Sequence, residues 1–514
     1  MPFLRPALAG TQPSVPRRAL RRLAPLPIAA LVAGCISTRG LAPAESLPTP
    51  QDSARAAGLA GEASVALPGA AWWTGYGDAE LSGWIDRGLA GNPNLKQAAA
   101  RVASARALAD AARGALSPSL GVTVDSTAER FSKNGIFPPP LGGNSYTLND
   151  ALLGANWDLD LFGKAAATAD AATLAAQAAD VDRQAARAEL ATSIARTWFA
   201  IGRLQRAREI AIATRAQRED IVKLVGQRVN AGLDTRVELR QAEGAVPQVN
   251  VEVEQIDEQV ALLKHQLATL AGQPPQAADG VAAKLPAVPL MAAPARLPLE
   301  LLARRADIAA ALLRVRAAGR EADAARADFY PNINLSAFAG FNALGLSHLL
   351  ETSSKTWGIE PALHLPIFDA GRLRANLAER RADATAAVEA YNATVLGAAR
   401  ETADALTSIT ALDRERTQQK LATEAAESAY DLAVVRYRAG LGTYLTVLTA
   451  DANVLVQRRL ASDLDARVAD LDVALVRALG GGWSATAATA GAAATNPTNS
   501  GAAASSDATP NPRS

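Results

Sequence analysis

Cysteine, histidine and aromatic residues are scarce in this sequence, and its net charge is close to zero. One cysteine among 514 residues excludes an intrachain disulfide and a cysteine-built zinc site. The three histidines lie far apart and form no metal-binding spacing such as HExxH. A formal charge of +1 gives no general field that would attract nucleic acid, so we expect no nucleic-acid partner. Aromatic residues make up only 4%, whereas abundant alanine, arginine, leucine and glutamate are typical of long helices.

Motifs of enzymes are also absent. The sequence contains no glycine-rich phosphate loop, no nucleophile paired with a base and no metal-ligand cluster. The glycines at 480–482 precede Trp483 and a tail (483–514) rich in Thr, Ala, Asn, Ser and Pro. This composition predicts disorder and not a phosphate cradle. We therefore expect neither an enzyme nor a bound cofactor.

Residues 1–34 have the order of an export signal. Arginines are followed by a short apolar stretch and then by small residues, which indicates a cleaved signal and not a spanning helix. The ending Val32-Ala33-Gly34-Cys35 resembles a bacterial lipobox, in which the cysteine becomes the lipidated first residue of the mature chain. Ile36 is not the aspartate that retains lipoproteins at the inner membrane, so an outer-membrane destination fits. The alternative is a soluble periplasmic protein with Cys35 as a free thiol.

The mature chain repeats one plan twice. Each repeat has a helix, a pair of alternating segments, a very long helix ending in Arg-x-x-Ala-Gly-Leu, and a last helix. The predicted parts are an N-terminal segment, 35–92; repeat 1, 93–271, with strand pair 119–161, long helix 165–231 and last helix 233–271; a linker, 272–298; and repeat 2, 299–482, with strand pair 332–367, long helix 372–439 and last helix 442–479.

The predicted helices carry coiled-coil spacing. Apolar residues recur in alternating steps of four and three, as in Ile256, Val260, Leu263 and Leu267, and this seam winds helices left-handedly. A helix of about 67 residues is about 100 Å long, more than a globular domain needs. Two shorter helices stacked end to end would match each long one. Each repeat is therefore predicted to be a two-stranded rod that carries a strand pair.

The strand pairs alternate between apolar and polar residues, as in a sheet with one apolar and one wet face. The candidate lipid-facing residues are Trp157, Leu159, Phe341 and Trp357. Strands of about 9–11 residues with these two faces suit a membrane barrel, and no segment after the signal approaches a spanning helix of about 18 apolar residues. The alternative is a hairpin packed on the helices in water. The first segment, around Leu120 to Val124, is predicted to be the shortest strand.

Four strands cannot close a barrel, because about eight make the smallest barrel that side chains can fill. Open sheet edges are not tolerated in lipid, so strands in the membrane would require an oligomer. Three copies would supply about 12 strands, enough to leave an aqueous lumen.

Several motifs resemble the outer-membrane efflux protein family, the TolC-like exit ducts of tripartite pumps, and most closely its lipidated OprM/NodT-type branch. The matching motifs are Trp72-Trp73, Tyr76 to Leu81, Asn92 to Leu95, Pro366 to Arg372, and Arg436 to Gly440 with Tyr444 to Leu448. The resemblance covers about residues 70–480. It implies a mainly α fold with membrane β: a homotrimer with a long coiled-coil α-barrel, a 12-stranded transmembrane β-barrel and an equatorial domain near 40–92, 272–298 and 480–483. It also implies a periplasmic adaptor and an inner-membrane pump, commonly of the RND type, as partners.

The resemblance places the two Ala-Gly-Leu turns at the periplasmic tip, where the adaptor docks. The candidate docking residues are Ala231, Gly232, Leu233, Ala439, Gly440 and Leu441. Arg228 and Arg436 lie one turn earlier and are either docking residues or solvated helix ends. Family members often narrow the tip with acidic residues, but Thr446 and Thr449 stand at those positions here. Glu238 and Asp451 are further gate candidates, and a hydroxyl-lined gate would select ions less strongly than a carboxylate ring.

Two other functions share the export signal and the helices. A periplasmic adaptor would place one helical hairpin between β segments and would not duplicate strands and rods together. A structural coiled-coil lipoprotein of the envelope would have no use for the alternating segments. The duplicated strand pair and rod therefore favour a duct.

Overall fold

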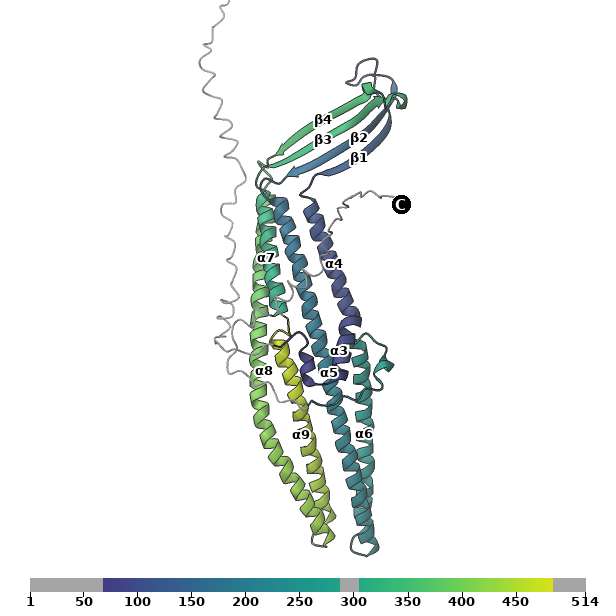
Figure 1. The fold of residues 1–514 in the computed structure, drawn as a ribbon, viewed down its shortest axis with the longest axis vertical. Helices are drawn as coiled ribbons and strands as arrows, with labels where there is room; N and C mark the ends of the chain where they lie inside the picture. The colour runs from purple at the N-terminus through teal and green to yellow at the C-terminus, as the bar shows by residue number, and fades with distance from the viewer. Residues whose placement is uncertain (1–67, 287–304, 484–514) are drawn as a thin grey trace, which may run out of the picture. The chain divides into compact units, whose positions relative to one another are not determined.

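The computed structural model describes residues 68–286 and 305–483 (Figure 1). These residues form two compact units, one made of 107–173 and 316–386 and the other of the remaining described residues. The predicted signal peptide, Cys35, much of the linker and nearly all of the C-terminal tail lie outside the described residues.

The first unit contains a single antiparallel sheet of four strands in the order β1-β2-β3-β4. The central pairing, β2 with β3, joins the hairpin of repeat 1 to that of repeat 2. Partners match one to one along every pair, so no bulge shifts a side chain to the other face. The strands are β1 (Ser119–Arg130), β2 (Ser145–Leu159), β3 (Asn332–Leu344) and β4 (Lys355–His364).

Two details of the sheet differ from the sequence prediction. β1 was predicted to be the shortest strand, but it extends over 12 residues because its polar second half continues to pair with Ser145–Asp150. β4 ends at His364, whereas the alternation of apolar and polar residues had predicted a strand that continues through Leu365 and Ile367.

The same local device starts both long helices after the sheet. Asp160 accepts hydrogen bonds from the backbone N–H groups of Ala165 (3.0 Å) and Ala166 (2.7 Å). Asp369 accepts from those of Gly371 (3.1 Å) and Leu373 (2.7 Å). Each carboxylate satisfies donors that a helix start leaves free and lies at the positive end of the helix dipole.

The helices have equal lengths in the two repeats. α5 (Lys164–Asn230) and α8 (Arg372–Arg438) have 67 residues each, and α6 (Arg236–Leu270) and α9 (Tyr444–Ala478) have 35 each. α4 (Pro93–Gly114) and α7 (Ala306–Ala327) have 22 each. This agreement confirms the predicted fold of a duplicated hairpin and rod.

A further helix, α3 (Ala79–Gly91), was not predicted. Asp78 caps it by accepting a hydrogen bond from the Leu81 N–H at 3.0 Å, and Leu81 and Ile85 are fully buried. The other Asp78 oxygen accepts a hydrogen bond from the indole of Trp198 on α5 at 3.0 Å. α3 therefore belongs to the largest hydrophobic core of the second unit.

The two repeats are joined in the second unit by a ladder of ion pairs between α5 and α9. Glu189 pairs with Arg477 at 2.8 Å, Arg196 with Asp470 at 3.0 Å and Arg203 with Asp463 at 3.0 Å. Successive rungs lie a heptad apart on both helices. Because these side chains are about half exposed, each pair contributes little stability, but together they fix the register of the two helices.

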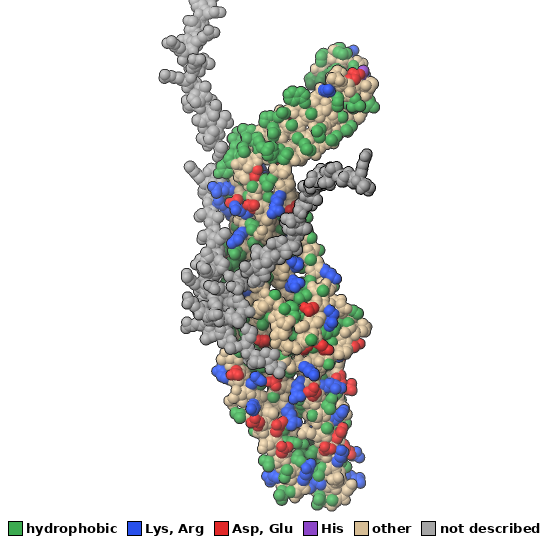
Figure 2. Space-filling view, viewed as in Figure 1, with side chains coloured by type: hydrophobic (Ala, Val, Ile, Leu, Met, Phe, Trp, Pro, Cys, Tyr) green, Lys and Arg blue, Asp and Glu red, His purple; other side chains and the backbone are tan. Residues whose placement is uncertain are grey.

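Charged side chains of both signs are interspersed over the helices, whereas hydrophobic side chains gather over the sheet in this view (Figure 2). Across residues 68–286 and 305–483, no helix has the length and apolarity needed to span a bilayer. The same residues contain no group of three or more His, Cys, Asp or Glu side chains placed to hold a metal ion.

Candidate functional sites in the sheet and the helix-end turns

The register of the sheet separates its side chains into two different faces. Residues that lie directly opposite one another share a face, and residues alternate along each strand. One face, here the apolar face, carries Leu120, Val122, Val124, Leu153, Trp157, Leu335, Phe341, Trp357, Ile359 and Leu363. The other, here the polar face, carries Asp125, Glu129, Asp150, Asn156, Asp158, Asn334, Ser336, Asn342 and Glu360.

All four predicted lipid-facing residues, Trp157, Leu159, Phe341 and Trp357, lie on the apolar face. On β2 the apolar run extends from Ala151 to Leu159, about 30 Å along a strand. At a tilt of about 40° it would cover a band of about 23 Å, close to the height of the apolar belt of outer-membrane barrels. Lys355 lies opposite Phe341 at one end of the run, and the Trp157 indole donates to the Leu116 carbonyl (3.1 Å) near the other.

The two outer strands, β1 and β4, each have one unpaired edge within the described chain. Every residue of β1 is exposed, including the apolar Leu120, Val122 and Val124. An exposed apolar edge strand is a template for pairing with another chain. Both outer edges of the sheet are therefore open to pairing with a further strand.

The two long helices end in the same type of turn, here called turn 1 (residues 231–235) and turn 2 (residues 439–443). Gly232 and Gly440 adopt left-handed φ angles of 73° and 74°. The N–H of Leu233 donates to the Arg228 carbonyl (2.9 Å), and that of Leu441 to the Arg436 carbonyl (2.8 Å). Both are Schellman caps, which explains the glycine in each phrase.

The structure brings the predicted docking residues together in these two turns. Ala231, Gly232 and Leu233 are all exposed in turn 1, as are Ala439, Gly440 and Leu441 in turn 2. The leucines are the most apolar of them and are 64% and 69% exposed, respectively. Each turn therefore exposes one leucine side chain next to the solvent-exposed backbone of its glycine.

Arg228 is not the solvated helix end that one alternative predicted. Its guanidinium binds Asp234 with contacts of 2.8 and 3.3 Å, and both side chains are only 12% exposed. It also donates to the carbonyl of Tyr437 (3.0 Å) and lies 4.6 Å from the centre of that ring. The Tyr437 hydroxyl donates to Asp234, so the cluster connects turn 1 to the end of α8.

The cluster shifts two pKa values in opposite directions. The hydrogen bond from Arg228 lowers the pKa of Asp234, because it favours the ionised carboxylate. Burial, reinforced by the hydrogen bond to Asp234, raises the pKa of Tyr437. The sequence prediction missed Asp234 and Tyr437, although both lie within a few residues of the two glycines. Arg436, the counterpart of Arg228, is exposed.

The four gate candidates do not form one group. The hydroxyl of Thr449 donates to its own helix at the Leu445 carbonyl (2.9 Å), and that of Thr446 lies 3.2 Å from the Thr443 hydroxyl. Glu238 belongs to a capping box with Thr235 at the start of α6. Asp451 forms an ion pair with Arg218 of α5 at 2.9 Å and is 10% exposed. Its carboxylate therefore connects the repeats and is not solvated, whereas the gate role of Thr446 and Thr449 stays a prediction.

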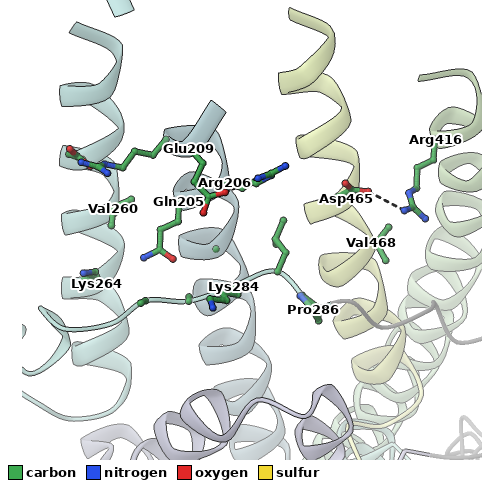
Figure 3. A pocket seen from close by; sticks show the side chains of 16 residues that line it. Gln205, Arg206, Glu209, Val260, Lys264, Lys284, Pro286, Arg416, Asp465 and Val468 are labelled. Atoms are coloured by element: carbon green, nitrogen blue, oxygen red, sulfur yellow. Dashed lines mark hydrogen bonds and ion pairs between the residues drawn. The ribbon is translucent and has the colours of Figure 1, made fainter. Parts of the chain in front are cut away.

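A groove of about 1010 Å³ lies on the helices of the second unit (Figure 3). The segment Ala282–Pro286 runs along it, with Gln205 of α5, Val260 of α6 and Val468 of α9 nearby. Two ion pairs lie at the groove: Arg416 with Asp465 at 3.1 Å, and Arg208 with Asp257 at 2.6 Å. These pairs hold neighbouring helices together.

Paired long helices that end in exposed turns, together with a two-faced sheet that has open edges, are the features of a membrane duct protein. The outer membrane efflux protein family model matches residues 84–273 and 297–481. The chain belongs to this family, which confirms the resemblance seen in the sequence.

Known relatives agree with this assignment. The chain is 34% identical over 362 residues to the fusaric acid resistance protein FusA of Burkholderia cepacia, covering 69% of this chain and 68% of FusA. It is 30% identical over 472 residues to the pyoverdine export outer membrane protein OpmQ of Pseudomonas putida, covering 90% of this chain and 98% of OpmQ. The crystal structure of the outer membrane protein VceC of Vibrio cholerae matches with a TM-score of 0.77 and 36% identity, over 81% of this chain and 99% of VceC.

Proposed function

We propose that this outer-membrane efflux protein works as a homotrimeric, passive duct that carries small molecules from the periplasm to the exterior. The observation that carries the proposal is the four-stranded sheet with one apolar face, one polar face and two open edges. A periplasmic adaptor or a structural coiled-coil lipoprotein would have no use for such a sheet.

The trimer follows from the geometry of barrels. Four strands are too few to close, and open edges are too costly in lipid. Pairing β1 of one copy with β4 of the next would satisfy both edges, and three copies would give about 12 strands with an aqueous lumen. The apolar face would then meet lipid and the polar face would line the lumen.

The periplasmic adaptor is proposed to dock on turn 1 and turn 2. Both turns expose a leucine next to backbone that no side chain covers, which is the kind of small apolar anchor that fits a pocket on a partner. An inner-membrane pump, of the RND type in our proposal, would supply the energy and select the cargo. Relatives named for fusaric acid resistance and pyoverdine export suggest small organic molecules as cargo.

The anchor is proposed to be lipid attached to Cys35, which would tether each copy to the outer membrane in addition to the barrel. Several acyl chains on one cysteine hold more firmly than one. A passive duct needs no cofactor and no catalytic residue, and we propose none.

The first test combines mass and conductance. We expect the mature chain in detergent to have three times the monomer mass, by size exclusion with light scattering, and to conduct ions in a planar lipid bilayer. Val122→Arg places a charge on the apolar face and should cost about 2–4 kcal/mol per copy at the bilayer midplane, so insertion should fail.

Thr123→Arg is the matched control, because the adjacent residue of the same strand points to the polar face. It should still form trimers that conduct. A monomer without conductance, or equal behaviour of the two variants, would contradict the proposed duct.

A further inference from the structure

The charged residues of the sheet are sorted by face. The polar face carries five carboxylates and no lysine or arginine on its four strands: Asp125, Glu129, Asp150, Asp158 and Glu360. The apolar face carries Arg130 and Lys355, near its outer end, and no carboxylate. Alternation of polar and apolar residues does not by itself separate acidic from basic side chains. Because the acidic residues all lie on the polar face and the basic residues on the apolar face, the polar face is negatively charged.

Two of these carboxylates, Asp150 and Asp158, accept hydrogen bonds from neutral donors. The Asn342 side-chain amide donates to Asp150 at 2.6 Å, and that of Asn334 donates to Asp158 at 2.7 Å. In both cases an aspartate of β2 lies directly opposite an asparagine of β3. An amide fixes the carboxylate oxygen without cancelling its charge.

Three carboxylates of α9 in the same chain are, by contrast, neutralised by ion pairs. Asp451, Asp463 and Asp470 all form ion pairs with arginines of α5. Among the residues that the structure describes, none of the five carboxylates of the polar face forms an ion pair with Lys or Arg. Their charge therefore remains available to act on a mobile ion.

Two of the carboxylates also lie directly opposite each other. Asp125 of β1 and Asp150 of β2 are register partners. Like charges in this position destabilise a strand pair. The arrangement is more favourable where mobile cations from the solution accumulate and screen the repulsion.

At the helix-end turns the situation is reversed. The candidate gate positions Thr446 and Thr449 are uncharged, and the two nearby acids, Glu238 and Asp451, are engaged in a capping box and a buried ion pair. The turns thus offer less free negative charge than the sheet.

We infer that the carboxylates of the polar face are the specificity-determining residues that make this duct prefer cations, a role that the turns do not share. The inference rests on the proposed trimer, in which three polar faces surround the lumen. Negative side chains in a water-filled passage with low-dielectric walls raise the local concentration of cations and lower that of anions. They act through their field on passing ions and do not require one to bind.

The test is the reversal potential of single channels in a planar bilayer under a KCl gradient. The sheet variant combines Asp125→Asn, Asp150→Asn, Asp158→Asn and Glu360→Gln, which remove four of the five charges and keep the size of each side chain. The matched turn variant combines Thr446→Ala and Thr449→Ala. We expect the native channel to prefer K⁺, the sheet variant to shift toward zero potential, and the turn variant to match the native channel.

Two further measurements test the inference independently of the fourfold variant. The pair Asp125→Asn and Asp150→Asn, a smaller change, should shift the potential part of the way even if the fourfold variant does not insert. The preference of the native channel should also weaken near 1 M salt, where the screening length falls to about 3 Å.

A conducting sheet variant that retains the native cation preference, or a turn variant that loses it, would overturn the inference and leave the proposed duct standing. A native protein that never conducts would overturn both.

Discussion

Turn 1 and turn 2 have the same backbone conformation but differ in the side-chain contacts that stabilise it. Both have a left-handed glycine, a Schellman cap, an exposed leucine and a threonine before the next helix. Turn 1 alone has a carboxylate after the leucine, Asp234, where turn 2 has Gly442. The helix after turn 1 has the acid that completes a capping box, Glu238, where the helix after turn 2 has Thr446.

This difference shows what duplication has kept and what it has changed. The kept features form the outer surface of each turn, as expected if both present the same feature to a partner. The changed features are internal contacts. The end of α8 before turn 2 is joined to turn 1 through Tyr437 and Asp234, whereas Asp234 is also held by Arg228 of its own repeat. Turn 2 should therefore open locally at a lower free energy than turn 1.

The largest expected effect comes from removing the guanidinium that connects the turns. Arg228→Ala leaves Asp234 mostly buried without its cation, and breaking a buried pair costs about 3 kcal/mol. The local opening equilibrium should rise roughly 150-fold. Hydrogen–deuterium exchange of peptides covering 225–240 and 434–446 measures this directly.

Arg436→Ala is the matched control at the corresponding position of repeat 2. Because Arg436 is exposed and forms only a 3.4 Å contact with the Leu441 carbonyl, its removal should cost less than about 0.5 kcal/mol. Equal exchange in the two variants would show that the Arg228 cluster does not stabilise the turns.

A smaller effect is expected where the turns are alike. If both leucines contact the adaptor, Leu233→Asp and Leu441→Asp should each weaken its binding by about 2 kcal/mol, roughly 30-fold. The measurement is biolayer interferometry of this chain and the two variants against a purified periplasmic adaptor protein.

Leu262→Asp is the control for this comparison. Leu262 of α6 is 58% exposed, similar to both leucines, but it lies far along the helix from turn 1. Its replacement should leave binding unchanged, provided that the trimer mass is also unchanged. Loss of binding in the control, or no loss in either turn variant, would exclude docking on the turns.

The sequence predicted the features of this molecule that depend on neighbours in the chain. Heptad spacing predicts the long helices, and a glycine after each of them predicts the left-handed turn at which the helix ends. The two faces of β2, β3 and β4 follow from alternation. Each signal lies within a short window, so no knowledge of the fold was needed.

The features that it did not predict depend on residues far apart. The Arg228 cluster requires Tyr437, which belongs to the other repeat. The capped helix α3 is short, and its apolar side chains pack on Trp198 and other residues of the second unit. The second half of β1 has no apolar alternation and is a strand only because Ser145–Asp150 supplies its hydrogen-bond partners.

The smallest expected effect concerns the first turns of α6 and α9. The Thr235 hydroxyl accepts a hydrogen bond from the Val237 N–H (3.1 Å), and Glu238 accepts one from the Thr235 N–H (3.0 Å). Thr443 makes no such side-chain cap. Thr235→Ala should therefore destabilise the start of α6 by about 1 kcal/mol, and Thr443→Ala should change α9 by only a few tenths. Hydrogen–deuterium exchange rates at residues 236–239 and 444–447 measure both changes. Equal destabilisation of the two helix starts would mean that the two threonines act alike in spite of their different partners.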